Sequence, residues 1–255
     1  MPRSKSCVAL LLAFTAGFVD IVGAITIYDV FTAHMTGTTV RMGQHLLERN
    51  WQAVILAVSV VAAFLCGSIL GRLLIEIGSR TALRRVASVN LVLEGALLAL
   101  VVPIGNSALQ RGHAGAESIA VICPLLATLA AAMGLQTATL TRVGPLTVHT
   151  TFITGMMNKF AQLVSRWMFL IYDIHLGDTA LGGIWRRDRD KVSREARFIF
   201  AIWLVYFLGA ICGTWFGTRS GLTALYVPCC ILLICIAVDQ WQPLSLQEEK
   251  EQAEQ

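Results

Sequence analysis

The sequence predicts an all-α membrane protein with several transmembrane helices, because it is rich in apolar residues, poor in charge and divided into long apolar runs. Of its 255 residues, 56% are hydrophobic and only 14% are charged, whereas soluble domains carry about 25% charged residues. The runs approach the roughly 20 residues that a helix needs to cross a hydrocarbon core about 30 Å thick. The core helices of a soluble protein would need a polar face, and the run 53–65 has none.

Six runs are predicted to span the membrane because of their length and their lack of charge. They cover residues 8–28, 52–71, 86–104, 119–141, 198–217 and 221–239. The first run follows the basic residues Arg3 and Lys5, but it is too long for the apolar core of a signal peptide and carries Asp20, with Asp29 at its end. We therefore expect it to remain as the first span.

Three motifs occur twice in the same order, which predicts an internal duplication. AGFVD (16–20) corresponds to MGLQT (133–137), HMTGTTV (34–40) to TFITGMM (151–157), and CGSILGR (66–72) to CGTWFGTR (212–219). The expected halves are residues 1–105 and 106–240, followed by an acidic tail at 241–255. Because each half has three spans, an odd number, we expect the halves to be inverted relative to each other. This construction recurs in secondary transporters, where the substrate binds near the midplane.

In each half, one segment either crosses the membrane fully or lies in it as a re-entrant or interfacial helix. These segments are residues 31–48 and 150–171. Arg41, Glu48 and Arg49 argue against a full crossing of the first, and we favour a short re-entrant or interfacial helix in both places. If both segments crossed fully, each half would have four spans and the halves would be parallel.

The basic residues predict the orientation, because Lys and Arg near span ends favour the cytoplasmic side. They are concentrated after the second and fourth spans, at Arg72, Arg80, Arg84 and Arg85 and at Arg186, Arg187, Arg189, Lys191, Arg194 and Arg197. The connection between the third and fourth spans carries only Arg111, as an outside loop should. We therefore expect a protein of the plasma membrane with both termini in the cytoplasm.

The motifs GFVD, AHMTGTTV, GLQTA and TTFITG, together with Glu94, resemble the YoaK-like family of uncharacterised membrane proteins over nearly the whole chain. The resemblance implies six spans and no established activity. Family members typically have Asn after the first Thr-Gly pair and often Asn after GLQ, where this chain has Thr38 and Thr137. If the asparagine side chains of the family bind a ligand, threonine at these two positions would change the identity or the affinity of that ligand in this chain.

Asp20 and Glu94 are acidic residues near the middle of the first and third runs. An acid at that depth costs about 2.5–3.5 kcal/mol on insertion scales, and it normally faces the bundle interior and marks an ion or proton pathway. The structural alternative is a buried acid held by a neighbouring Ser, Thr or Asn, and Asn90 lies one turn before Glu94. We weigh function above structure for Asp20, and both equally for Glu94.

Polar residues around the two Thr-Gly pairs are the other candidate ligands of a small solute. Thr36 and Thr154 precede flexible glycines, and they are expected to cap helices whose free amide groups face a cavity suited to an anionic group. The alternative is that small residues only allow close helix packing. The candidates for substrate or ion binding are Asp20, Glu94, His34, Thr36, Thr38, Gln136 and Thr154. Two GxxxG pairs are assigned to packing, Gly67 with Gly71 and Gly213 with Gly217.

The sequence has no GxxxxGK[ST], HExxH or GxSxG motif, so we expect neither ATP-driven transport by this chain alone nor an enzyme. The seven cysteines lie in or beside apolar runs without a CxxC pair, and we expect no disulfide, metal or cofactor. The leading hypothesis is a small transporter or channel-like carrier, with proton coupling as one option. Its expected partners are the lipid bilayer and an unknown solute or ion, without nucleic acid. A non-transporting scaffold or regulator is the alternative, an intramembrane lipid enzyme is weaker, and a homodimer would enlarge the thin bundle.

Overall fold

The computed structural model describes residues 3–28, 30–81, 85–111, 119–143, 146–176 and 182–242. Most of these residues are helical, and one short β-hairpin accompanies the helices. The elements are α1 (Arg3–Thr26), α2 (Met35–Leu47), α3 (Trp51–Arg80), α4 (Val86–Arg111), α5 (Ile119–Thr139), β1 (Arg142–Val143), β2 (Leu146–Thr147), α6 (Ile153–Leu176), α7 (Gly182–Ser220), the 3₁₀-helix η1 (Gly221–Leu225) and α8 (Tyr226–Trp241).

Five stretches of the described chain are long and apolar enough to cross a membrane. They are Ser4–Thr26, Trp51–Arg80, Val86–Ala108, Ile119–Thr139 and Trp185–Trp241. The last stretch has 57 residues and contains two of the expected apolar runs, one in α7 and one in η1 and α8. The prediction of a helical membrane protein that crosses the bilayer several times is therefore confirmed.

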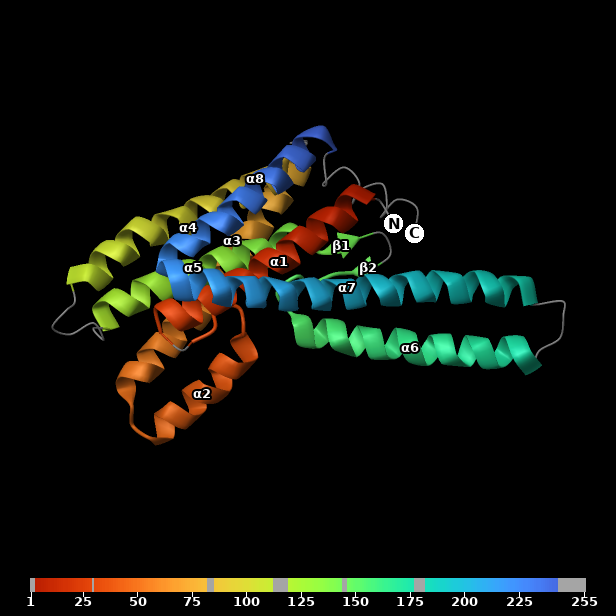
Figure 1. Ribbon diagram of the computed structural model, residues 1–255, viewed down its shortest axis with the longest axis horizontal. Helices are drawn as coiled ribbons and strands as arrows, with labels where there is room; N and C mark the ends of the chain where they lie inside the picture. Colours follow the sequence, from red (N-terminus) through yellow and green to blue (C-terminus); the bar gives the residue numbers. More distant parts are fainter. Residues whose placement is uncertain are drawn as a thin grey trace.

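The central helices of the bundle are α1 and α5, with α3, α4 and α8 on one side and α7 on the other (Figure 1). In the most apolar window of α1, 72% of the residues are buried, and in that of α5 56% are buried, against 22% in α3. A helix that is apolar all round is buried when protein surrounds it and faces lipid when protein covers one side only. Both α1 and α3 are apolar enough to cross a membrane, so hydropathy alone does not distinguish the buried helix from the more exposed one.

Two helix pairs, α1 with α7 and α3 with α5, are in closest contact because glycines lie at their crossings. A Cβ atom added at Gly17, Gly209, Gly67 or Gly134 would lie 2.2 Å from a backbone carbonyl oxygen of the partner helix. No side chain fits at that distance, so these four glycines permit the approach of the two backbones. The central helices are thereby tied to α7 and α3.

Helix α7 extends well beyond its expected apolar run, residues 198–217. α7 has 39 residues, which corresponds to about 58 Å at a helical rise of about 1.5 Å per residue. The basic stretch 186–197, expected as a connection, forms the N-terminal part of this helix. Oppositely charged residues lie four positions apart in this stretch, and this spacing stabilises an exposed helix. α6 packs along α7, and the two helices form a hairpin that extends beyond the bundle (Figure 1).

The two segments that were left open, residues 31–48 and 150–171, contain the helices α2 and α6. α2 has 13 residues, fewer than the roughly 20 that a crossing needs, and α6 is not among the membrane-crossing stretches of the described residues. Strands β1 and β2 pair in antiparallel fashion and were not expected, although the Gly-Pro dipeptide between them is a turn signal. The rest of the connection after Arg111, residues 177–181 and the acidic tail beyond residue 242 lie outside the described residues.

Candidate functional site

Asp20 anchors the loop between α1 and α2. Its side chain is 4% exposed, and its Oδ1 atom accepts hydrogen bonds from the Thr32 hydroxyl at 3.2 Å and from the Ala33 backbone N–H at 2.9 Å. Its Oδ2 atom accepts a hydrogen bond from the Tyr206 hydroxyl at 3.0 Å. Three donors therefore compensate the burial of this carboxylate, and they join α1, the loop and α7 at one point.

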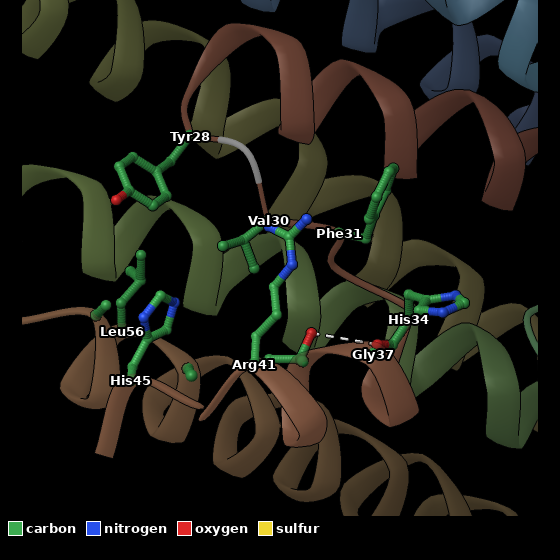
Figure 2. Close-up of a pocket in the computed structure, with 11 residues that line it drawn as sticks. Tyr28, Val30, Phe31, His34, Gly37, Arg41, His45 and Leu56 are labelled. Atoms are coloured by element: carbon green, nitrogen blue, oxygen red, sulfur yellow. Dashed lines mark hydrogen bonds between the residues drawn. The ribbon is translucent and has the colours of Figure 1, made fainter. Parts of the chain in front are cut away.

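The anchored loop forms one wall of a cavity of about 350 Å³. Helices α2 and α3 form the other walls, and Figure 2 shows the lining side chains. The lining residues are Tyr28, Val30, Phe31, His34, Gly37, Thr38, Arg41, His45, Ala53, Leu56 and Ala57. Of the candidate residues, the structure thus brings His34 and Thr38 into the cavity wall. Asp20 does not line the cavity, but the residues that it binds directly precede His34.

The polar groups of this cavity come mainly from α2. Arg41 reaches from α2 towards Val30, with His45 to one side and His34 to the other (Figure 2). The Nδ1 atom of His45 lies 3.3 Å from Oε2 of Glu48. A hydrogen bond from Gln44 and the contact with His45 lower the pKa of the Glu48 carboxyl, so that it stays ionised beside the histidine. Arg41 and His45 were noted in the sequence only as obstacles to a membrane crossing, and no local pattern indicates that they share a cavity.

The first Thr-Gly pair does not cap α2, because the helix begins at Met35 and places Thr36 inside its first turn. Thr36 is exposed, and the Thr38 hydroxyl donates to the backbone oxygen of His34 at 3.2 Å. A Cβ atom added at Gly37 would lie 2.4 Å from Cδ2 of His34. Gly37 therefore leaves room for the His34 ring over the first turn of α2. This contact explains why a glycine follows Thr36.

The second Thr-Gly pair has a similar arrangement at the start of α6. Thr154 is exposed in the first turn, and a Cβ atom added at Gly155 would lie 2.2 Å from the ring of Phe152. Gln136 is fully buried, and its Nε2 atom donates to the Leu12 backbone oxygen at 2.8 Å and to the Thr150 hydroxyl at 3.2 Å. Gln136 therefore holds the α5–α6 loop against α1, and neither Thr154 nor Gln136 lines the cavity beside α2.

Glu94 lies fully buried in α4, and neither of its carboxylate oxygens has a hydrogen-bond partner. Asn90, which the structural alternative offered as its partner, donates instead to the Gly71 backbone oxygen at 3.1 Å. The residue that follows Glu94, Gly95, lies against α8, where the Cys229 thiol donates to its backbone oxygen at 3.7 Å. Among the described residues, four other buried side-chain atoms lack hydrogen-bond partners: Thr15 Oγ1, Ser68 Oγ, Asn90 Oδ1 and Gln136 Oε1.

A third buried acid, Asp239 in α8, was not singled out in the sequence. Its Oδ2 atom accepts hydrogen bonds from both the backbone N–H, at 3.0 Å, and the hydroxyl of Ser88 in α4. Lys5 in α1 is also fully buried. The position of Asp239 near the end of the last apolar run was a signal for it in the sequence. Among the described residues, no group of three or more His, Cys, Asp or Glu side chains is arranged to hold a metal ion.

A family model for proteins of unknown function, DUF1275, matches residues 8–238 of the chain. The chain belongs to this family. A relative from Rhizobium meliloti (strain 1021), the UPF0700 transmembrane protein RA0705, is 25% identical over 256 aligned residues, which cover 96% of this chain and 94% of the relative. The UPF0700 transmembrane protein YoaK of Bacillus subtilis (strain 168) is 24% identical over 159 residues, which cover 62% of this chain and 67% of the relative. The resemblance to YoaK-like proteins is thereby confirmed, and no solved structure matches the chain.

Proposed function

We propose that this protein is a secondary carrier of a small solute, coupled to protons through Glu94, and not an enzyme. The observation that carries the proposal is the complete burial of Glu94 with both carboxylate oxygens unpartnered. An isolated ionised carboxylate costs far more in such surroundings than a neutral carboxyl group or a carboxylate paired with a cation. Glu94 therefore needs a proton or a cation in this conformation, and intramembrane acids of this kind mark ion or proton pathways.

Asp20 receives a different role in this proposal. Because three donors already satisfy its carboxylate, it holds the loop in place and does not exchange ions. From the sequence, Asp20 was the stronger functional candidate of the two acids, whereas its three contacts support a structural role. Glu94 becomes the coupling group, and Asp20 becomes a positioning residue between the cavity wall and α7.

The duplication with inverted halves, residues 1–105 and 106–240, is part of the proposal, and matching contacts support it. A Cβ added at Gly17 of α1 would lie 2.2 Å from the Tyr206 backbone oxygen of α7, and one at Gly134 of α5 would lie 2.2 Å from that of Phe64 in α3. α1 and α5 run in opposite directions, as do α3 and α7 (Figure 1). Inverted repeats of this kind are a common construction of secondary transporters.

The contacts also favour one correspondence between the two proposed halves. A Cβ added at Gly71 would lie 3.3 Å from the Leu135 backbone oxygen, and one at Gly213 would lie 2.8 Å from that of Phe18. Gly71 therefore corresponds to Gly213, and Gly67 to Gly209. This register differs by one helical turn from the sequence match, which pairs Gly67 with Gly213, because small residues recur in both helices.

We further propose six crossings with both termini in the cytoplasm, in a plasma membrane. The stretch Trp185–Trp241 is too long for one crossing at 57 residues, and the turn at η1, with Gly221 at a φ of 57°, divides it into α7 and α8. Six crossings return the end of α8 to the side where α1 begins. The basic N-terminal part of α7 would then lie in the cytoplasm, next to anionic lipids.

The test uses purified protein in liposomes that contain a pH-sensitive dye. A panel of small anions, cations and neutral metabolites is added under an imposed pH gradient. Proton flux that depends on one of these solutes is expected from the native protein and is expected to disappear in Glu94→Gln. Glu76→Gln is the matched control, because Glu76 is an exposed acid in α3 paired with Arg80 at 2.8 Å. Solute-dependent proton flux that persists in Glu94→Gln would exclude Glu94 as the coupling group, and silence across the panel with folded protein would favour a non-transporting scaffold.

A further inference from the structure

The cavity beside α2 combines basic groups with an apolar wall. Its size, about 350 Å³, is near the lower limit of ligand pockets, which measure about 300–1,000 Å³. Arg41, His34 and His45 are its titratable lining residues apart from Tyr28, and Glu48 adjoins His45 from outside the lining. None of the described lining residues is acidic. A ligand in this cavity therefore meets positive charge and hydrogen-bond donors from α2.

The other lining residues of the cavity are mostly apolar. Leu56 and Ala57 contribute from α3, and Val30 and Phe31 contribute from the anchored loop (Figure 2). Such a wall excludes a small, fully hydrated ion as the best occupant, because an apolar surface gains nothing from contact with its hydration shell. It suits a molecule with an anionic group at one end and a hydrocarbon body at the other.

We infer that this cavity binds a small organic carboxylate, whose carboxylate group contacts Arg41 and whose apolar body lies against α3 and the loop. Guanidinium groups bind carboxylates in a planar, two-point geometry that also sets their orientation. Arg41 has an interaction of its own within the protein, but its five N–H donors serve a ligand in addition to a protein partner. The inference names the solute class of the proposed carrier and rests on that function for its role in transport.

The anchored loop connects the cavity to the contact between α1 and α7. Thr32 and Ala33 bind Asp20, and the next residue, His34, lies in the cavity wall. Asp20 in turn binds Tyr206 of α7. A ligand that orders the loop therefore acts on the α1–α7 contact through Asp20, without touching either helix.

Binding is measured by isothermal titration calorimetry on the purified full chain, without any gradient, so that it is separate from transport. Benzoate is the probe, benzamide is its neutral isostere, and inorganic phosphate represents a bare anion or a lipid headgroup. Benzoate is expected to bind, and benzamide and phosphate are expected to bind at least about tenfold more weakly, since a charge-assisted pair to arginine is lost or the apolar body is missing. The same titration in nanodiscs with and without anionic lipid is expected to give the same benzoate affinity, whereas competition from anionic lipid would assign the cavity to headgroups and overturn the inference.

Two variants and one control locate the site. Arg41→Gln is expected to weaken benzoate binding at least about tenfold by removing the charged donor, and Ala57→Leu is expected to do the same by filling the cavity. Arg80→Gln, which removes an exposed charge in α3, is expected to leave binding unchanged. Equal binding of benzoate and benzamide, or benzoate binding unaffected by both cavity variants, would overturn the inference. Binding without flux would instead overturn the carrier and leave the site standing.

Discussion

Replacing Asp20 by alanine is expected to release the loop that forms the cavity wall. The change leaves three groups without their acceptor: the Thr32 hydroxyl, the Ala33 backbone N–H and the Tyr206 hydroxyl. A buried donor left unsatisfied costs about 1–3 kcal/mol, and part of this cost is recovered because the hydroxyl groups rotate and the carboxylate is no longer desolvated. We therefore expect Asp20→Ala to lower the free energy of unfolding by about 3–5 kcal/mol.

The companion variant Tyr206→Phe removes one of the three donors and is expected to cost about 1–2 kcal/mol. Unfolding of the purified protein in mixed micelles, titrated with SDS and followed by the fluorescence of its six tryptophans, gives both values. The double variant completes a thermodynamic cycle, and the coupling between Asp20 and Tyr206 is expected to be about 1 kcal/mol or more. A cost below about 1 kcal/mol for Asp20→Ala, or a coupling near zero, would show that the loop does not depend on this carboxylate.

Four further changes are measured by the same titration. Gly17→Ala is expected to lower the free energy of unfolding by about 1–3 kcal/mol, because its Cβ would lie 2.2 Å from the Tyr206 backbone oxygen, whereas Gly43→Ala, with nothing within 4 Å, is expected to raise it by about 0.5–1 kcal/mol. Glu94→Met is expected to raise it by about 1–3 kcal/mol, because an apolar side chain replaces an unpartnered buried carboxyl group. Ser88→Ala is expected to lower it by about 1–3 kcal/mol, because the buried acid in α8 loses a donor.

Each of these changes has an outcome that contradicts its reasoning. Equal stability of Gly17→Ala and Gly43→Ala would mean that α1 and α7 separate without cost. Destabilisation by Glu94→Met would mean that the carboxyl group has a stabilising partner, such as a bound water or ion. A neutral Ser88→Ala would mean that the backbone N–H alone holds the acid.

The membrane-crossing segments were predictable from the sequence because the bilayer imposes one requirement, a long run without charge. The N-terminal part of α7 was not predicted, because it is highly charged and lies outside any apolar run. A charged segment of this kind occurs both in exposed helices and in loops. Spacing at three and four residues was the available signal there: Arg186 and Asp190 lie four residues apart, as do Lys191 and Glu195. Charge pairs at that spacing predict that the helix includes residues 186–197.

The candidate site was predictable only in part. Asp20 and Glu94 stand out because acids are rare within apolar runs, but the sequence does not distinguish a satisfied acid from an unsatisfied one. The partner of Asp20, Tyr206, lies 186 positions away along the chain, and no local pattern connects them. Thr36 was misread because a threonine before a glycine resembles a helix cap, whereas here the glycine serves the ring of His34.

The pairing of α1 with α7 has a consequence for the synthesis of the protein. α1 is the most buried of the candidate spans, with 72% of its apolar window covered, yet its main partner begins at Gly182 and is translated only after three other spans. Until α7 is made, α1 lacks this partner, and Asp20 lacks the hydrogen bond from Tyr206. Contacts between such distant segments form late and slowly, so assembly of this bundle is expected to depend on how long the insertion machinery retains its first helix.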